Sequence, residues 1–555
     1  MQGKRLWLGV CAGLAALLPA SAYFVGAQAQ SPTQPPLALT GQVTSDAEGA
    51  MEGVVVSAKK AGSTVTISVI SDAQGRYSFP TERLSAGKYT LKIRAIGYDL
   101  AGAATAEVGD TKTANVDLKL RKTRNLAAQL NNAEWMMSFP GTEEQKAFLL
   151  GCTGCHTMER IARSSHDADQ WTHVLTRMSG YAPVSAPIKP QRMLDPARTR
   201  DPETFRKQAD YLATVNLSEG YQWEYPLKTL PRPSGRATRV IITEYDLPRP
   251  TTKPHDVILD AQGMVWYSDF GELFISKFDP KTLKLTEYPV KEFKAGAPVG
   301  NLSLEFDKKG TLWFDTMFQG SLGNLDPKTE QIAYYPLAPE FNDVRVQLNF
   351  TGLRYDVDGK VWTKSVGTQD IFRLDLASGK WERFQPLKAL PGGPHSIYQV
   401  ISDSQNNLWM AEFTKGHIGK LDAKTGQATW WKLPTENARA RRMNIDDQDR
   451  IVVTEYRGNK VAIFDTRSEK VMEYATPAST WPYRATIDKN GDIWTGGMHS
   501  DRAVRINPKT GETVEYLLPR ETNMRSVFVD NTTTTPTFWV GNNNGAALIK
   551  VEPLD

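Results

Sequence analysis

The sequence has few cysteines, little excess charge of either sign and no long apolar run beyond its first residues. Three cysteines in 555 residues are too few for disulfides to hold together a fold of this size. The 66 basic and 62 acidic residues leave a formal net charge of +4, which disfavours a nucleic-acid-binding protein because such proteins usually present a basic face. No later segment is long and apolar enough to span a bilayer, so we expect no integral membrane segment after residue 30.

Residues 1–30 predict an export signal. Lys4 and Arg5 precede an apolar stretch over 6–18, and the small residues at 20–22 form a cleavage site. An uncleaved membrane anchor is the alternative, which the short apolar run disfavours. Cys11 lies inside this segment and would be lost with it. We therefore expect a periplasmic or secreted protein, with 31–37 as a linker.

Residues 38–121 alternate apolar and polar side chains between glycine-rich turns, which predicts a small β-sandwich. The segment resembles the carboxypeptidase regulatory-like domain, a resemblance carried by Gly41-x-Val43, Asp72/Gly75/Tyr77, Gly87-x-Tyr89 and Gly97-Tyr98. Such a domain implies a stalk, a spacer or a weak carbohydrate binder, because no catalytic pair or metal-ligand cluster stands out in this stretch.

Residues 236–555 repeat a strand ending near a proline and a strand carrying Trp, seven times each, with Val452 in place of Trp in one copy, at spacings of 42 to 49 residues. A unit of this length holds about four strands, which is typical of a propeller blade. The first proline-ended strand, at 240–248, precedes the first Trp strand, so we expect it to complete the last blade. The predicted fold class is mainly β and multidomain: a sandwich, a small helical domain and a seven-bladed β-propeller.

Residues 126–222 predict helices over 126–137, 143–151, 167–178 and 201–215. They contain Cys152-Thr153-Gly154-Cys155-His156, the C-x-x-C-H signature of covalent haem c attachment. Two thiols at this spacing can add to the two vinyl groups, and the adjacent imidazole can ligate the iron. A redox dithiol is the competing interpretation, which the immediate histidine disfavours.

The same segment resembles the cytochrome c domains of bacterial periplasmic dehydrogenases. The similarity rests on C-x-x-C-H, on the W-x-x-V-x-x-R-M pattern that ends at Met178 and on the later Y-L-A at 211–213. The resemblance implies Met178 as the second axial ligand of the iron. Met193 is the alternative, since other cytochromes place this ligand just before the last helix, and His166 and His173 are weaker candidates.

Aligning the propeller repeats places polar residues at the start of each inner strand, near the central channel. This position is occupied by His255, Leu302, Thr351, Tyr398, Arg441, Tyr483 and Arg525, and the next by Asp256, Arg442 and Arg484 in three of the repeats. One interpretation is a solvated channel mouth with salt bridges. The other is a site for a small polar or anionic substrate, bound by Arg441, Arg442, Tyr483, Arg484 and Arg525.

The propeller repeat also resembles the virginiamycin B (streptogramin) lyase family. The shared texture is P-H-x-I/V, then D-x-x-G-x-L/V-W-F/Y-x-E/D, then a short hairpin, over essentially all of 240–555. In that family a histidine and a glutamate, with magnesium, support ring opening by elimination. The matching pairs are His255 with Asp269 and His395 with Glu412, and neither reproduces the family pattern cleanly.

Three functions follow from these features. The first is an exported haem c protein, an electron-transfer component or oxidoreductase that serves a periplasmic redox partner or a small-molecule substrate. The second is a lyase-like enzyme, with magnesium as a candidate ion in the propeller and an accessory cytochrome domain. The third is a non-catalytic ligand-binding protein.

Overall fold

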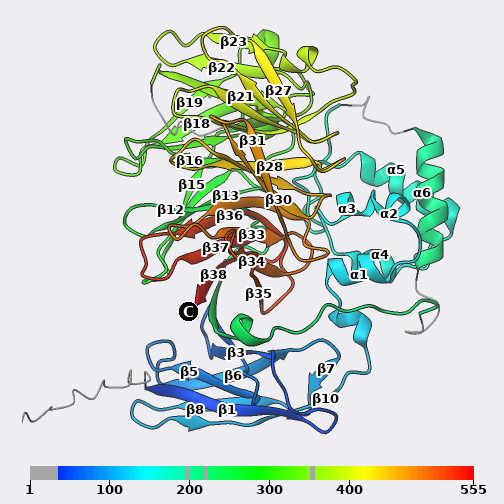
Figure 1. The fold of residues 1–555 in the computed structure, drawn as a ribbon, viewed down its shortest axis with the longest axis vertical. Helices are drawn as coiled ribbons and strands as arrows, with labels where there is room; N and C mark the ends of the chain where they lie inside the picture. Colours follow the sequence, from blue (N-terminus) through cyan, green and yellow to red (C-terminus); the bar gives the residue numbers. More distant parts are fainter. Residues whose placement is uncertain (1–35, 196–200, 217–222, 351–356) are drawn as a thin grey trace, which may run out of the picture. The chain divides into compact units, whose positions relative to one another are not determined.

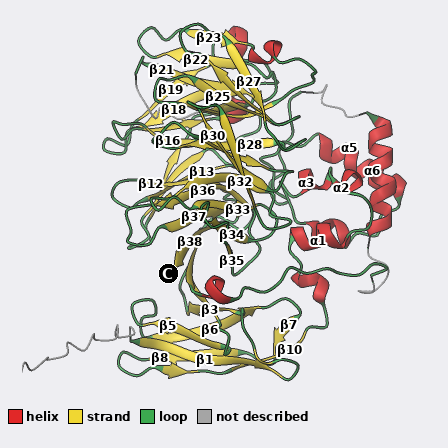
Figure 2. Ribbon diagram, viewed as in Figure 1, coloured by secondary structure: helices red, strands yellow, loops and turns green. Residues whose placement is uncertain are grey.

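The structure is a computed structural model that describes residues 36–195, 201–216, 223–350 and 357–555. The predicted export signal, Cys11 and Thr351 lie outside these residues. Strands make up most of the regular structure, and the longer helices are confined to one stretch of the chain (Figure 2). In the part of the chain that is described, no helix is long and apolar enough to cross a membrane.

The first strands fold into a β-sandwich-like region around β1, as the alternating pattern predicts. β1 pairs with β2, β5, β9 and β10, while β3 pairs with β4 and β6. The strands are β1 (Leu37–Ser45), β2 (Gly49–Ala50), β3 (Val55–Lys60), β4 (Val65–Ile70), β5 (Arg76–Pro80), β6 (Gly87–Arg94), β7 (Tyr98–Leu100), β8 (Ala104–Val108), β9 (Ala114–Asn115) and β10 (Leu118–Lys122). Leu39, Val56 and Phe79 are fully buried in the core between the two layers.

Helices follow, beginning with the short 3-10 helix η1 (Leu126–Gln129). The α-helices are α1 (Asn132–Ser138), α2 (Glu143–Lys146), α3 (Leu149–Cys152), α4 (Met158–Ala162), α5 (Ala168–Ser179) and α6 (Pro202–Val215). The helices expected over 167–178 and 201–215 agree with α5 and α6. The one expected over 143–151 is divided into α2 and α3, and α4 was not predicted, because one turn of helix leaves too little periodicity to detect.

Six four-stranded antiparallel sheets follow in chain order (Figure 1). The first three are β12 (Pro254–Leu259), β13 (Val265–Asp269), β14 (Phe274–Phe278), β15 (Leu285–Pro289); β16 (Leu304–Phe306), β17 (Leu312–Asp315), β18 (Ser321–Leu325), β19 (Ile332–Pro336); β20 (Leu348–Phe350), β21 (Lys360–Ser365), β22 (Ile371–Asp375), β23 (Trp381–Phe384). The next three are β24 (Ile397–Ser402), β25 (Leu408–Glu412), β26 (His417–Leu421), β27 (Ala428–Lys432); β28 (Ala440–Ile445), β29 (Ile451–Glu455), β30 (Lys460–Asp465), β31 (Lys470–Ala475); β32 (Pro482–Ile487), β33 (Ile493–Gly497), β34 (Arg502–Ile506), β35 (Thr513–Leu517).

The seventh sheet joins the two ends of this region. β36 (Met524–Asp530), β37 (Thr537–Asn542) and β38 (Ala547–Pro553) pair in order, and β38 then pairs with β11 (Val240–Asp246). The strand expected at 240–248 therefore completes the last blade, as predicted. β36 also contacts β12, which closes the sheets into the ring that seven repeats predict.

In four of the repeats the Asp-turn and the Trp form one local unit. The indole Nε1 of Trp266 donates to Asp260 at 2.8 Å, and that of Trp409 donates to Asp403 at 2.9 Å. The same bond, again across six residues, joins Trp313 to Asp307 and Trp494 to Asp488. The large apolar ring fills the space between blades while the aspartate satisfies its single donor, which explains the recurring spacing.

Candidate functional site

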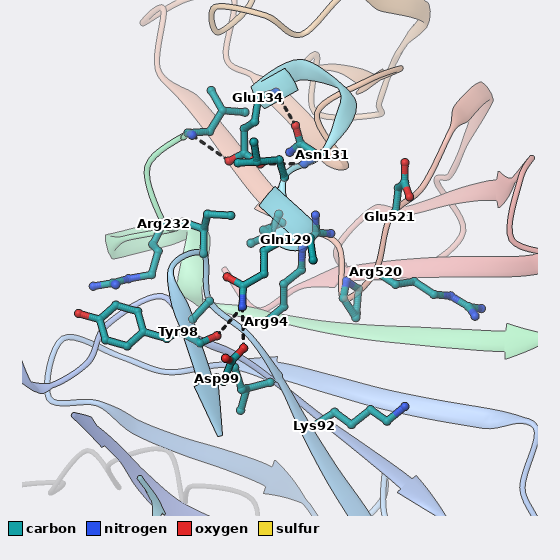
Figure 3. A pocket seen from close by; sticks show the side chains of 18 of the residues that line it. Lys92, Arg94, Tyr98, Asp99, Gln129, Asn131, Glu134, Arg232, Arg520 and Glu521 are labelled. Atoms are coloured by element: carbon teal, nitrogen blue, oxygen red, sulfur yellow. Dashed lines mark hydrogen bonds between the residues drawn. The ribbon is translucent and has the colours of Figure 1, made fainter. Parts of the chain in front are cut away.

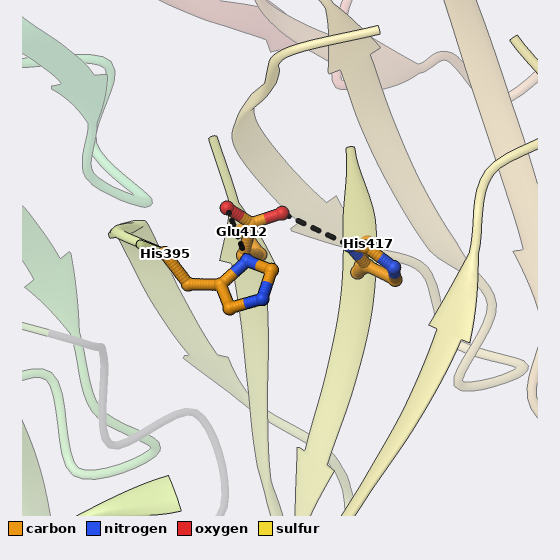
Figure 4. A group of neighbouring side chains, drawn as sticks. All are labelled: His395, Glu412 and His417. Carbon is orange, nitrogen blue, oxygen red and sulfur yellow. Dashed lines mark hydrogen bonds and ion pairs between the residues drawn. The ribbon is translucent and has the colours of Figure 1, made fainter. Parts of the chain in front are cut away.

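Two imidazoles meet one carboxylate in the β24–β27 blade (Figure 4). Glu412 ends β25 and His417 begins β26, so the two residues face each other across a hairpin. His395 lies in the loop just before β24. The Nδ1 atoms of His395 and His417 lie 3.4 and 3.0 Å from the two oxygens of Glu412. One ligating atom from each residue lies within 4.8 Å of the others, so the three could hold one metal ion.

The fold prepares Glu412 as a buried anion. Its carboxylate accepts backbone N–H groups of Thr414 at 2.7 Å and Lys415 at 3.0 Å. Burial alone would raise the pKa of Glu412, but the hydrogen bond from His417 and these amides lower it below its ordinary value. The side chain of Glu412 is 0% exposed and that of His417 is 15% exposed, so a cation would reach the carboxylate past His417.

The sequence paired His395 with Glu412, and the structure brings the two together. It did not identify His417. The available signal was local: His417 lies five residues after Glu412, and Gly416 at φ 79° allows the tight hairpin that sets them opposite each other.

His255 and Asp269 do not form the other expected pair. His255 Nδ1 lies 2.7 Å from Asp256, whereas Asp269 forms an ion pair with Arg249 at 3.0 Å. Asp269 lies opposite Pro254 in the pairing of β12 with β13, so the side chain of His255, the next residue along the strand, points to the other face. His255 is 0% exposed, and its carboxylate partner is its own neighbour in the chain.

The five residues predicted to bind a substrate lie together in the channel. Guanidinium carbons of Arg441, Arg442 and Arg525 lie 4.4, 5.4 and 5.4 Å from the ring centroid of Tyr483. Asp256 binds Arg442 at 2.8 Å and lies 3.7 Å from Arg484. All five side chains are buried. Salt bridges with Asp256 explain why Arg442 and Arg484 are buried here, while Arg441 packs on aromatic rings.

The segment carrying the cysteines lies directly against this channel. The carbonyl of Thr153 accepts from Asn523, and the carbonyl of Gly154 accepts from Arg525 and from Lys253, at 3.3 to 3.4 Å. Lys253 is also held by the carbonyl of Ser185 at 2.8 Å. Burial lowers the pKa of Lys253 to about 8. The predicted haem-attachment motif therefore contacts the polar ring of the propeller.

A cavity of about 510 Å³ opens beside the motif, lined by Cys155, His156, Arg160, Arg163 and others. Cys152 and Cys155 are not joined by a disulfide. His156 Nδ1 lies 3.1 Å from the carbonyl of Thr157, which can only accept, so this nitrogen carries the proton. Burial lowers the pKa of His156, so the ring is neutral and its Nε2 lone pair could ligate a metal.

Neither predicted axial methionine lines this cavity. Met178 on α5 is 39% exposed, and Met193 packs against a small cluster that includes Phe270 and Leu302. The choice between the two methionines stays a prediction.

A second cavity, of about 420 Å³, lies among β6, β7, α1 and the chain before β36 (Figure 3). Its charged lining includes Arg94, Glu134, Arg520 and Glu521. Burial and then the nearby Asp501 raise the pKa of Glu521 to about 8. Sequence reasoning missed this cavity, because its walls come from segments roughly 400 residues apart.

Two segments match known families. Residues 387–553 match the virginiamycin B lyase family, and residues 38–121 match the carboxypeptidase regulatory-like domain. The matches support the two resemblances for these segments, while the similarity of 126–222 to cytochrome c domains stays a prediction. No curated protein matches the chain in sequence.

Solved structures that the chain resembles include a virginiamycin B lyase from Staphylococcus aureus and a second structure described as a streptogramin B lyase. The streptogramin B lyase is 21% identical with a TM-score of 0.48, and the match covers 57% of this chain and 99% of the lyase chain. The virginiamycin B lyase is 21% identical with a TM-score of 0.47, and the match covers 56% of this chain and 98% of that lyase chain. The extracellular domain of a one-component system from B. thetaiotaomicron is 19% identical with a TM-score of 0.41, covering 54% and 39%.

Proposed function

We propose that the propeller is a metal-dependent lyase-type enzyme whose ion is held by His395, Glu412 and His417. The observation that carries the proposal is the convergence of these three ligating groups within 4.8 Å. All three lie inside the segment that matches the virginiamycin B lyase family. That match supports elimination as the reaction class.

The donor set favours a particular kind of ion. Two imidazoles and one carboxylate suit zinc, manganese or iron better than magnesium, which prefers oxygen ligands. A divalent ion bound there would supply a Lewis acid that polarises a substrate carbonyl. The chain's own part is to keep Glu412 ionised through backbone amides and to hold both imidazoles against it.

Metal content tests the site. We expect the purified protein to bind one divalent ion per chain, measured by elemental analysis after dialysis against zinc or manganese. Glu412→Gln and His417→Gln should each weaken binding at least tenfold. Glu455→Gln is the matched control, because Glu455 ends the equivalent strand of the next blade and lies opposite Lys460 instead of a histidine. Equal metal binding by Glu412→Gln and the wild type would overturn the site.

Product mass tests the reaction. Elimination across the ester of a cyclic depsipeptide opens the ring without changing its mass, whereas hydrolysis adds one water. We expect a ring-opened product of unchanged mass, formed by the wild type and lost in His395→Gln. If the protein binds the metal but forms no such product, the lyase assignment is rejected and a non-catalytic binding function remains.

Haem c attachment is the second candidate function, favoured by the unbridged cysteines, the orientation of His156 and the adjoining cavity. Cys152 and Cys155 would hold the porphyrin by thioether bonds, and His156 Nε2 would ligate the iron. A bound haem would supply one-electron transfer to a periplasmic redox partner or a small-molecule substrate.

The spectrum of the protein tests attachment. We expect protein exported from a host with a cytochrome c maturation system to show reduced haem c bands that survive acid-acetone extraction. Cys152→Ser with Cys155→Ser should abolish retained haem, and Met178→Ala compared with Met193→Ala should identify the second axial ligand. A colourless wild-type protein from that host would reject this function.

A further inference from the structure

Two positively charged side chains of the propeller converge on the backbone of the predicted haem-attachment motif. Lys253 Nζ, from just before β12, and Arg525 Nη2, on β36, each lie 3.4 Å from the carbonyl oxygen of Gly154. Gly154 lies between the two cysteines of the motif. We call Lys253 and Arg525 the motif cations. Because β12 and β36 belong to the first and last blades, the motif contacts the propeller where its ring closes.

Both motif cations are buried, and their hydrogen bonds go to neutral groups. Lys253 is 3% exposed and Arg525 is 5% exposed. Lys253 also donates to the carbonyl of Ser185 at 2.8 Å, and Arg525 Nε donates to the side-chain oxygen of Asn523 at 2.6 Å. Neutral oxygens satisfy the N–H donors of a cation but carry no negative charge to balance it.

The carboxylate that acts on Lys253 is already paired with another cation. Asp269 favours the charged form of Lys253, but it forms an ion pair with Arg249 at 3.0 Å. Burial and, to a smaller extent, repulsion from Arg525 lower the pKa of Lys253 to about 8, which leaves Lys253 mostly protonated at pH 6.5. Two like charges therefore share one buried place, which costs free energy unless a further group compensates for them.

Other cations of the channel are compensated more directly. Arg442 binds Asp256 at 2.8 Å, and Arg484 lies 3.7 Å from the same carboxylate. Arg441 lies 4.1 Å from the ring centroid of Tyr456, whose face attracts a cation. The motif cations lie farther from aromatic rings, with centroid distances of 5.4 and 5.6 Å. The cations that contact the motif are thus the ones whose charge the surrounding side chains balance least.

A haem attached at the motif would be affected by this charge. Attachment through Cys155 and ligation by His156 would place the iron close to residue 154 along the chain. Reduction of ferric iron adds one electron and removes one positive charge, so buried cations nearby stabilise the reduced state. Salt screens the charges of buried groups much less than those of exposed groups.

We propose that Lys253 and Arg525 raise the reduction potential of a haem attached at the motif, so that this haem acts as an electron acceptor. The proposal rests on haem c attachment, the second candidate function. Each reduction takes one electron from the redox partner or small-molecule substrate, which is oxidised by one electron. Arg525, one of the five residues predicted to bind a substrate, then acts on the haem instead.

A potentiometric titration of the full-length protein with attached haem, at pH 6.5, tests the proposal. Lys253→Gln and Arg525→Gln each remove one positive charge and keep an amide N–H donor. At a fixed electrode potential, each should lower the ratio of reduced to oxidised haem about tenfold, a fall in midpoint potential of about 59 mV. The fall should persist in about 0.5 M salt, because both side chains are buried. Arg525→Lys keeps the charge and should keep the wild-type midpoint.

Arg160→Gln is the matched control for an exposed charge. Arg160 lines the cavity beside the motif and is exposed, so its substitution should lower the midpoint less, and not at all in about 0.5 M salt. The proposal fails if Lys253→Gln and Arg525→Gln retain haem with an unchanged midpoint, or if their shifts disappear in salt.

The spectrum of each protein separates this proposal from haem attachment itself. A wild-type protein without haem rejects attachment, and the proposal with it. If one of the two glutamine variants loses its haem or its fold, the other decides, with the melting temperature showing that it is folded. Loss of haem from both variants overturns the proposal, because the motif cations would then be needed for attachment and not for the potential.

Discussion

At the residue scale, Glu412 and Glu455 occupy the same place in neighbouring blades with opposite electrostatics. Each ends the second strand of its blade, β25 and β29. Hydrogen bonds from His417 and backbone amides keep the pKa of Glu412 low despite burial. Burial and then the nearby Glu473 carboxylate raise the pKa of Glu455 to about 8, and Lys460, which is paired with Glu473 at 2.6 Å, lowers it by less. Near neutral pH the first is an anion and the second is mostly protonated.

Glu455→Gln should therefore stabilise the protein in a pH-dependent way. A carboxyl group whose pKa is higher in the folded state contributes stability that is complete below its unfolded pKa of 4.5 and is lost as the pH rises through about 8. Compared with the wild type, the variant should gain melting temperature between pH 5 and pH 9, by about 2 °C or more. Calorimetry across this range, with a chelator present, measures the difference.

Glu412→Gln is the control of opposite sign. Its folded pKa is depressed, so its stabilising effect is present above pH 4.5 and is lost as the pH falls through the folded value. This substitution should lower the melting temperature at pH 7 to 9 and less so at pH 4. If the melting temperatures of both variants changed with pH in the same direction relative to the wild type, the opposite pKa shifts of Glu412 and Glu455 would be contradicted.

At the element scale, β11 is shared between two cores. It pairs with β38 along one edge and with β4 of the sandwich-like region along the other, so both regions are joined in one eight-stranded sheet. Because successive side chains of a strand point to opposite faces, Ile241 packs in the sandwich core and Ile242 in the last blade. The last blade consequently has no free outer edge along β11, which protects it from edge-to-edge association.

Neighbouring substitutions on β11 should destabilise different regions. Ile241→Ala and Ile242→Ala should each cost about 2–5 kcal/mol, because both remove buried methyl groups. Hydrogen exchange read by mass spectrometry should then rise in β1 and β5 for Ile241→Ala and in β36 to β38 for Ile242→Ala. Identical exchange patterns would mean that the two cores unfold as a single unit.

At the scale of the whole molecule, the loop between β33 and β34 contacts both preceding regions. Asp501 in this loop binds Arg94 of β6 at 2.6 Å, and Arg94 also donates to the carbonyl of Leu518 at 2.8 Å. One residue earlier, the carbonyl of Ser500 accepts from Asn131, which caps α1. The side chain of Asp501 is 1% exposed, and Arg94 offsets the burial of this carboxylate more than the neighbouring Arg502 does.

Arg94→Met should destabilise the protein by about 3–5 kcal/mol, because it leaves the Asp501 carboxylate buried without its cation. Chemical unfolding monitored by tryptophan fluorescence measures the change. Lys59→Met is the comparison, since the exposed Lys59–Asp246 pair is worth about 1 kcal/mol or less. Arg94→Met combined with Asp501→Asn should recover part of the loss. If Arg94→Met and Lys59→Met lowered the free energy of unfolding by a similarly small amount, the buried Arg94–Asp501 pair would not be what stabilises the contact between these regions.

Much of the candidate chemistry could be predicted from the sequence where it depends on local spacing. Cys152, Cys155 and His156 form a contiguous motif, and His395 and Glu412 belong to a repeated pattern. His417 could not be predicted, because a single histidine at the start of a strand belongs to no sequence motif and only the hairpin places it opposite Glu412. The predicted pairing of His255 with Asp269 failed because Asp269 lies opposite Pro254, whereas His395 stands two residues before Ile397, the residue opposite Glu412. Spacing along the chain does not show which residue of the first strand lies opposite the carboxylate.

The sequence by itself determined the number of blades, the strand that closes the ring and the place of the cysteine motif in the chain, because repeats and short motifs are local patterns. Only the tertiary structure decided that β11 also pairs with the sandwich-like region and that the cysteine segment contacts Arg525. It also decided that hydrogen bonds join the side chains of Tyr398, Tyr483 and His255. These contacts join residues 85 to 371 positions apart. The scarcity of cysteine that excluded a disulfide framework left this protein to be held together by such distant polar and apolar contacts.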